Sequence, residues 1–274
     1  MAVSNFIQTI WSKKIQDSLE LKCKLVDNCL RDYEGDCKYA STVKILGVGE
    51  PSVKNYKEVG SSGITVDEMS DVGQELAIDQ ANYFAFYVDD INKAQSVPGL
   101  AEEYQRKSVH KLAVARDTYV AGLIKSTTTN VTTATALTAE AIKAAIDNAI
   151  VALRERNFDE EGVIEITPAV YNLFKNNLIT LSTDNPEYIK KGKVGVYDDF
   201  DVIMSNNMAK DTTYAYCDVR GKKAIAFAGQ IHEVEALRSE KFFKDLVRGL
   251  DTFGAKVIDP ARIQVIKIPV KAAS

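Results

Sequence analysis

The stretch "DQANYFAFYVDDIN", residues 79–92, alternates its side chains with a period of two. Successive side chains of a β-strand point to opposite faces of the sheet. One face would carry Phe84, Phe86 and Val88, and the other Tyr83, Ala85 and Tyr87. Because both sets are largely apolar, the sequence predicts a strand that is covered on both sides.

Two adjacent carboxylates, Asp89 and Asp90, follow the aromatic run. Neighbouring strand residues face opposite ways, so these two groups cannot converge on one substrate atom as an acid and base pair. We interpret them as the end of the strand and the start of a turn toward Pro98.

A long helix is predicted for "PGLAEEYQRKSVHKLAVARDTYVAGLIK", residues 98–125, which has proline near its first turn and an extended apolar face. At 1.5 Å per residue it would span ~42 Å and cross the whole body. His110 lies on this helix, and we interpret it as an ordinary surface or core residue because His232 is far away along the chain.

A projecting hairpin is predicted for residues 43–57 and 64–78, which flank the turn "VGSSG" at 59–63. Fifteen extended residues reach ~50 Å, about the full width of a compact chain of this length. Such an arm bends repeatedly or projects. The alternative is a meander of short strands broken at Pro51 and Gly73.

The other segments indicate a mixed α+β chain. Residues 6–19 are predicted to form an amphipathic helix that docks on its own core or on a neighbouring subunit. A Thr-rich linker at 126–140 precedes a helix that Thr138 caps and an apolar stripe marks. "VIEI" at 163–166 is a buried strand, followed by a helix with Thr167 as cap. The last third is strand-rich: a hairpin at 193–207, strands "TYAYCDV", "AIAFAG" and "IHEVEAL", and a long terminal strand in "GAKVIDPARIQVIKIPV".

Composition excludes several classes of protein. The 274 residues carry 34 basic and 38 acidic side chains, a net charge of −4, so nucleic-acid binding by charge alone is not expected. No stretch approaches a membrane helix or signal peptide. The spacing of Cys23, Cys29, Cys37 and Cys217 matches no zinc or redox pattern, and we interpret them as ordinary thiols.

Three motifs imitate catalytic sites. "KILGVGEPS" at 44–52 lacks the third glycine and the following helix of a dinucleotide site. "GSSG" at 60–63 lacks the spacing of a nucleophile elbow. Asp198, Asp199 and Asp201 most simply mark a hairpin turn, with weak cation binding as the alternative. The sequence therefore predicts neither enzyme activity nor a cofactor nor a metal.

The order of the segments resembles the major capsid proteins of tailed bacteriophages, which share the Hong Kong ninety-seven type of fold. The likeness rests on "RDYEG" at 31–35, "TVKI" and "EPSVKNY" in the loop, "DQANYFAFYVDDINKAQ", the spine-length helix and "GVYDDFDVIMSNN" at 195–207. It implies an N-terminal arm at 1–39, an extended loop at 40–75, a peripheral domain at 76–129 and 241–274, and an axial domain at 130–240.

The resemblance also implies a function. Members of that family form hexamers and pentamers that close an icosahedral shell around packaged double-stranded DNA. The expected partners are other copies of the chain, a separate scaffolding protein, a portal, and DNA held weakly and non-specifically, without a membrane. The expected location is the virion, with the host cytoplasm during assembly. No residue matches a cross-linking lysine or asparagine.

The resemblance implies intersubunit contacts in the arm and loop. The candidate interface residues are Phe6, Trp11, Arg31, Asp32, Tyr33, Val43, Ile45, Pro51, Val53, Tyr56, Lys57 and Glu58. Two alternatives remain: an encapsulin-like shell that stores an enzyme, and a soluble α+β enzyme assisted by a metal at Asp198, Asp199 and Asp201.

Overall fold

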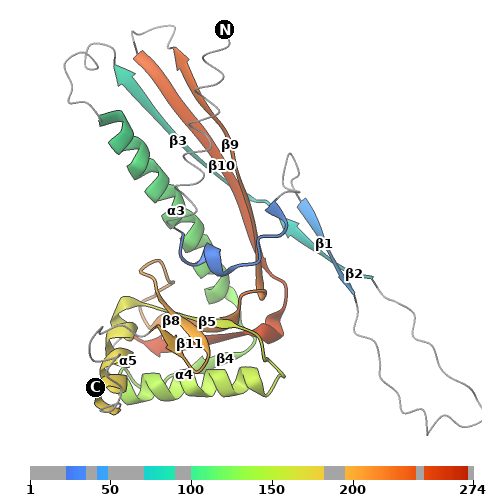
Figure 1. The fold of residues 1–274 in the computed structure, drawn as a ribbon, viewed down its shortest axis with the longest axis vertical. Helices are drawn as coiled ribbons and strands as arrows, with labels where there is room; N and C mark the ends of the chain where they lie inside the picture. The colour runs from blue at the N-terminus through green and yellow to red at the C-terminus, as the bar shows by residue number, and fades with distance from the viewer. Residues whose placement is uncertain are drawn as a thin grey trace, which may run out of the picture.

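A computed structural model describes residues 23–34, 42–48, 71–89, 100–181, 195–238 and 244–270. The chain forms an elongated molecule with a long three-stranded sheet at one end and a six-stranded sheet at the other (Figure 1). A two-stranded hairpin extends to one side. Helices and strands both contribute extensively, which confirms the predicted α+β class. The predicted N-terminal helix at 6–19 lies outside the described residues.

The long sheet is antiparallel and has β10, Lys244–Val257, between β3, Gln80–Asp89, and β9, Ile225–Arg238. Phe84 and Phe86 pack against the core on one face of β3, as predicted. Tyr83 and Tyr87 on the other face are 78% and 61% exposed. Among the described residues, α3 covers the phenylalanine face and the tyrosine face stays exposed, so the expectation of a strand covered on both sides is wrong for the part of the subunit that the structure describes.

The spine helix α3, Leu100–Ser126, confirms the predicted long helix. It runs beside the long sheet and ends at the six-stranded sheet (Figure 1). Buried residues recur at helical spacing along it, in the order Val109, Leu112, Ala113, Arg116, Asp117, Val120, Ala121 and Ile124. One helix therefore contributes to the interior at both ends of the molecule.

The six-stranded sheet is mixed. Its strands in spatial order are β4 (Val131–Thr133), β11 (Ile263–Pro269), β8 (Tyr214–Gly221), β5 (Gly162–Ile166), β7 (Phe200–Met204) and β6 (Val196–Tyr197). Helices α4, Ala139–Arg154, and α5, Pro168–Leu181, share one hydrophobic core with it. Thr138 caps α4 as predicted, accepting a hydrogen bond from the Ala141 amide. α5 starts at the predicted place, but the buried Oγ1 of Thr167 has no hydrogen-bond partner.

The side hairpin pairs β1, Thr42–Val48, with β2, Asp71–Ala77. Val43, Ile45 and Leu76 form a small core with Ala226 and Ala228 of β9. This pairing confirms the base of the predicted hairpin. The expected remainder of the arm, residues 49–70, lies outside the described residues.

The predicted terminal strand is confirmed at Ile263–Pro269, but it does not extend back over the whole of residues 254–270, because the strand is interrupted between β10 and β11. A 3-10 turn, η4, Pro260–Arg262, separates them, and the Asp259 side chain accepts a hydrogen bond from the Ala261 amide. The two strands enter different sheets: β10 pairs with β3, whereas β11 pairs with β8 and β4. Likewise, "AIAFAG" and "IHEVEAL" form one continuous strand, β9, in the long sheet. β9, which lies within the predicted axial domain of 130–240, therefore pairs in the long sheet. β11, which lies within the predicted peripheral segment of 241–274, pairs in the six-stranded sheet.

Candidate functional site: the N-terminal junction and the exposed sheet face

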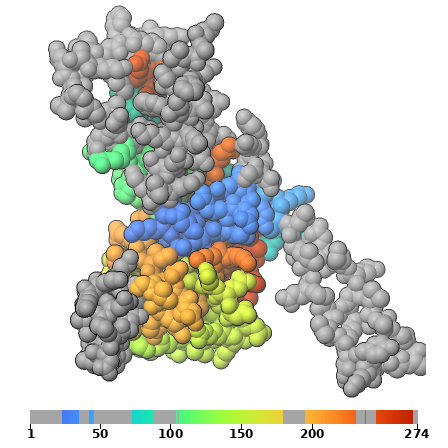
Figure 2. Space-filling view, in the orientation of Figure 1, coloured from blue at the N-terminus to red at the C-terminus, as the bar shows by residue number. Residues whose placement is uncertain are grey.

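The first described segment, which we call the N-terminal turn, is residues 23–34 around the 3-10 helix η1, Val26–Asn28. It is coloured blue in Figure 2 and lies across the middle of the molecule. Leu25 and Val26 are buried in the core that contains α3. Leu30 is bonded to β9 through its amide and its carbonyl, which meet Ile225 and Phe227 at 2.8 and 2.9 Å. The turn therefore ties α3 and both sheets together.

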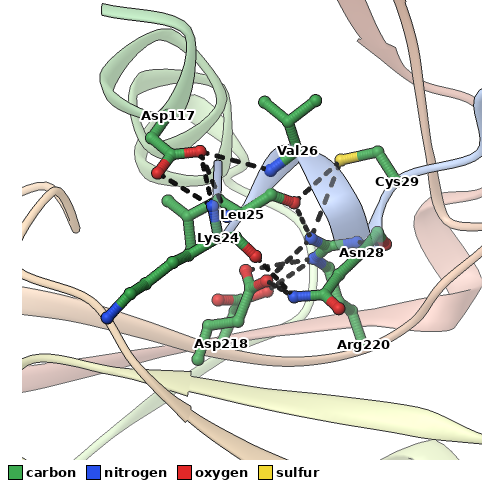
Figure 3. A network of polar contacts seen from close by, with 9 residues as sticks. Lys24, Leu25, Val26, Asn28, Cys29, Asp117, Asp218 and Arg220 are labelled. Carbon is green, nitrogen blue, oxygen red and sulfur yellow. Dashed lines mark hydrogen bonds and ion pairs between the residues drawn. The ribbon is translucent and has the colours of Figure 1, made fainter. Parts of the chain in front are cut away.

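Asp117 of α3 holds the amide side of this turn (Figure 3). Its carboxylate accepts hydrogen bonds from the backbone amides of Lys24, Leu25 and Val26 at 3.1, 3.1 and 3.3 Å. The side-chain amide of Asn207 donates a fourth at 3.1 Å. An anionic acceptor satisfies amides that a short turn leaves without partners, and such charge-assisted bonds are stronger than neutral ones.

Arg220 of β8 holds the carbonyl side. Its guanidinium donates to the Asn28 carbonyl at 2.6 Å and to the Leu25 carbonyl at 3.2 Å. The same group donates to both carboxylate oxygens of Glu165 of β5, at 3.0 and 3.3 Å. Asn28 closes the network by donating from its side chain to Glu165 at 3.0 Å. The turn is thus clamped by a carboxylate on one side and a guanidinium on the other.

A third charged group, Asp218, lies under the clamp, and its Oδ2 is 3.2 Å from the Nε of Arg220. Glu165, Asp218 and Arg220 are each fully buried. Burial raises the pKa of Glu165, against the lowering effect of the Arg220 charge. Burial and then the charge of Glu165 raise the pKa of Asp218 well above its usual value. Burial alone would lower the pKa of Arg220, but the neighbouring carboxylates more than offset it and raise it.

A second buried ion pair connects α3 to the long sheet. The Nε of Arg116 donates to Asp251 Oδ2 of β10 at 3.0 Å, and its Nη2 donates to the other oxygen. The guanidinium also lies 5.6 and 5.8 Å from the ring centroids of Phe227 and Phe253. This pair fixes the position of α3 on the sheet, because a planar guanidinium meets a carboxylate in one orientation.

The exposed face of the long sheet carries several uncovered apolar side chains. Tyr83 lies opposite Leu250 in the ladder, and both are exposed, Leu250 at 40%. Tyr87 lies opposite Leu246, which pairs in turn with the exposed Leu237. Exposed patches of this kind mark surfaces that meet other molecules.

A groove of about 570 Å³ lies between β3 and the first half of α3. Its lining residues include the aromatic Phe84 and Tyr104 and the basic Lys107 and Lys111. Tyr83, an exposed residue of β3, also borders it.

The predicted interface residues divide into three groups. Arg31, Asp32 and Tyr33 lie in the N-terminal turn, where Arg31 pairs with Glu34 at 2.8 Å and Tyr33 packs on the small hairpin core. Val43 and Ile45 are 5% and 4% exposed and lie inside that core, where they hold the hairpin base within the subunit. The other seven, Phe6, Trp11, Pro51, Val53, Tyr56, Lys57 and Glu58, lie outside the described residues.

The acidic hairpin turn shows no metal geometry. Asp198 and Asp199 lie in the turn of the β6–β7 hairpin, as predicted, and have left-handed backbone angles, with φ of 51° and 68°. Arg154 approaches both carboxylates, at 3.1 and 3.8 Å, and Lys222 approaches Asp201. Within the described residues, no group of acidic, cysteine or histidine side chains has the arrangement of a metal site.

Sequence reasoning missed the buried clamp, although a signal was present. Asp218 and Arg220 alternate with Cys217 and Val219 in an otherwise apolar strand, and Glu165 interrupts another. Charged residues inside buried strands indicate a paired internal site.

Cys23, Cys29 and Cys217 are free, buried thiols, and burial raises the pKa of each to about 12. No described helix has the length and apolar character of a membrane span.

Comparison with known proteins identifies the family. Residues 73–266 match the model of a family described as phage capsid protein. The chain therefore belongs to the phage capsid protein family, and it is a shell-forming major capsid protein. No curated protein sequence matches the chain.

Solved structures share the fold. Mycobacterium phage Che8 matches at 28% identity and a TM-score of 0.74, over 89% of this chain and 90% of that one. The capsid of cyanophage P-SCSP1u matches at 16% identity and a TM-score of 0.69, over 89% and 86%. A virus-like particle from Pyrococcus furiosus matches at 12% and 0.61, over 95% and 99%. The last two likenesses describe the fold, which confirms the predicted Hong Kong ninety-seven type.

Proposed function

We propose that the exposed face of the long sheet is an intersubunit surface of an icosahedral phage head built from hexamers and pentamers. The single observation that carries this proposal is the row of uncovered side chains on that face, above all Tyr83 and Tyr87. A tyrosine buries about 150–250 Å² when it is covered, so aromatic residues at such positions dominate interface energies.

The proposed domain arrangement and partners follow from the resemblance to phage capsid proteins. The six-stranded sheet with α4 and α5 would be the axial domain, and the long sheet with α3 the peripheral domain. The N-terminal turn would join the arm to both, and Arg31, Asp32 and Tyr33 remain candidates for contact with a neighbour. A separate scaffolding protein, a portal and weakly held DNA complete the proposed partners, with assembly in the host cytoplasm before the chain resides in the virion.

The test is the double variant Tyr83→Ser/Tyr87→Ser. It should keep the melting temperature and circular dichroism spectrum of the wild-type subunit, because both side chains are exposed in the subunit. Electron microscopy should then find few or no closed shells under conditions where the wild type assembles.

A matched control is Val151→Ser/Val196→Ser, which removes two exposed apolar side chains from α4 and β6, 53% and 51% exposed. This control should assemble normally. Shell formation by the tyrosine variant at the wild-type level would contradict the assignment of the sheet face. Wild-type subunits that stay monomeric under every assembly condition would contradict the shell architecture itself.

A further inference from the structure

Glu165 and Asp218 are ladder partners on the neighbouring antiparallel strands β5 and β8. Their strand neighbours Ile164 and Val219, also partners, face the α4–α5 core. The two carboxylates therefore point to the opposite face of the sheet, beneath the N-terminal turn. Like charges directly opposite in a ladder repel each other, and here both groups are fully buried.

The charges at this place do not balance if both carboxylates are ionised. Arg220 supplies one positive charge against two negative ones. It gives two hydrogen bonds to Glu165, whereas neither oxygen of Asp218 accepts a well-formed hydrogen bond. An ionised carboxylate without hydrogen-bond donors is strongly unfavourable inside a protein, so such a group keeps a proton.

We propose that Asp218 holds a proton, which it shares with Glu165, and that this proton is a lock: its loss releases the N-terminal turn from Arg220. With the proton in place, the net charge of Glu165, Asp218 and Arg220 is zero. Arg220 is then free to bind the carbonyls of Leu25 and Asn28.

The turn is the element that responds because it is bonded to two of the three charged groups: Arg220 donates to two of its carbonyls, and its Asn28 side chain donates to Glu165. Figure 3 shows Arg220 and Asp218 beside the turn. Without the proton, the anionic Asp218 competes with the two backbone carbonyls for the guanidinium. The new charge also needs water, and water reaches it when the turn lifts. Asn28 lifts with the turn, since its side chain binds Glu165.

The described surroundings contain further charged groups, but the positive charge that acts on Asp218 is that of Arg220. β11 presents the uncharged Val265 opposite Asp218. On α3, Asp117 raises the pKa of Glu165 further, and Arg116 is occupied by Asp251. The titratable residues of the turn itself are Cys23, Lys24, Asp27, Cys29, Arg31, Asp32, Tyr33 and Glu34.

The direction of the pH effect follows from the raised pKa of Asp218. The docked state keeps its proton at pH values where the released, hydrated carboxylate has lost it. Docking is therefore most stable below the usual aspartate value of 3.8 and weakens as pH rises toward the raised value.

Thiol labelling of the unassembled subunit tests this lock. Cys23 and Cys29 belong to the turn and are buried, while Cys217 lies in the α4–α5 core and reports global unfolding. The measurement uses a Cys37→Ser background. Each labelling rate is divided by the rate of a free thiol peptide at the same pH, which removes the pH dependence of the thiol itself. The ratio is the equilibrium constant for opening of the turn. For the wild type this equilibrium should rise by up to about tenfold per pH unit, the slope for one proton.

Asp218→Asn is the decisive variant, because an amide has the shape of the protonated acid and can donate to Glu165. Its opening equilibrium should be independent of pH and lower than that of the wild type at alkaline pH. The matched control, Asp147→Asn, changes an aspartate of α4 that pairs with Lys143 and should keep the wild-type profile. Equal slopes for the wild type and Asp218→Asn would overturn the proposal, as would Cys217 reacting together with Cys29.

Glu165→Gln provides a second route to the same answer if the first variant folds poorly. Asp218 then becomes the sole counter-ion of Arg220 and ionises, so no shared proton remains and the slope should vanish here too. A wild-type slope in this variant would also overturn the proposal. The measurement is made on subunits in solution, so its outcome is separate from whether the sheet face builds a shell.

Discussion

Arg116 of α3 and Asp251 of β10, 135 positions apart, form a two-pronged ion pair with both side chains almost fully buried. We expect Arg116→Met or Asp251→Asn to lower the free energy of unfolding by about 3–5 kcal/mol, because each leaves a buried charge without its partner. Urea denaturation of the subunit measures this change.

The double variant Arg116→Met/Asp251→Leu should recover much of that loss, since it removes both charges. A control is Arg154→Met, which breaks the half-exposed contact with Asp198 and should cost no more than about 1 kcal/mol. Equal losses at the buried and the exposed pair would show that burial does not govern the strength of Arg116–Asp251.

Asp117→Ala should release the N-terminal turn while the rest of the subunit stays folded. The variant removes an acceptor for three backbone amides and for Asn207, and each hydrogen bond to a charged group contributes roughly 1.5–3 kcal/mol. Trypsin should then cleave after Lys24 and Arg31 much faster than in the wild type. Asp147→Ala is the control, and unchanged cleavage in Asp117→Ala would mean that Arg220 alone holds the turn.

Gly254→Ala should destabilise the subunit by about 1–3 kcal/mol, the range for added atoms in a packed interior. A Cβ at Gly254 would lie 2.0 Å from the Ala77 carbonyl oxygen, where β10 passes the connection between β2 and β3. Gly73→Ala, in β2, meets nothing within 4 Å and should leave the melting temperature unchanged. If both variants melt alike, this close approach does not limit the packing.

Asp211 should make the loop before β8 sensitive to acid. Hydrogen bonds from the backbone amides of Tyr214 and Thr213, and then from the Tyr216 hydroxyl, lower the pKa of Asp211 from 3.8 to about 2. A lowered pKa adds stability above the usual value and loses it as pH falls from 3.8 toward 2. Hydrogen exchange of the Tyr214 amide should accelerate over that range, and Asp211→Asn should remove the acid dependence. Acceleration that persists in the variant would assign the effect to another carboxylate.

Local pattern was enough to predict several elements. A period of two identified β3 and its two faces, helical spacing identified α3 and α4, and Pro168 marked the start of α5. These signals are local because a residue's face depends on its position within its own helix or strand. The family resemblance also followed from segments that the sequence displays in order.

Tertiary structure alone decided what covers each face and which strands pair. The pattern of β3 is apolar on both sides, yet α3 covers only the phenylalanine face and leaves Tyr83 and Tyr87 exposed. The same holds for the clamp: the sequence contains Glu165, Asp218 and Arg220, but their meeting depends on the register of β5 against β8. Register and burial arise from contacts between distant segments, and they determine whether a carboxylate meets water, a guanidinium or another carboxylate.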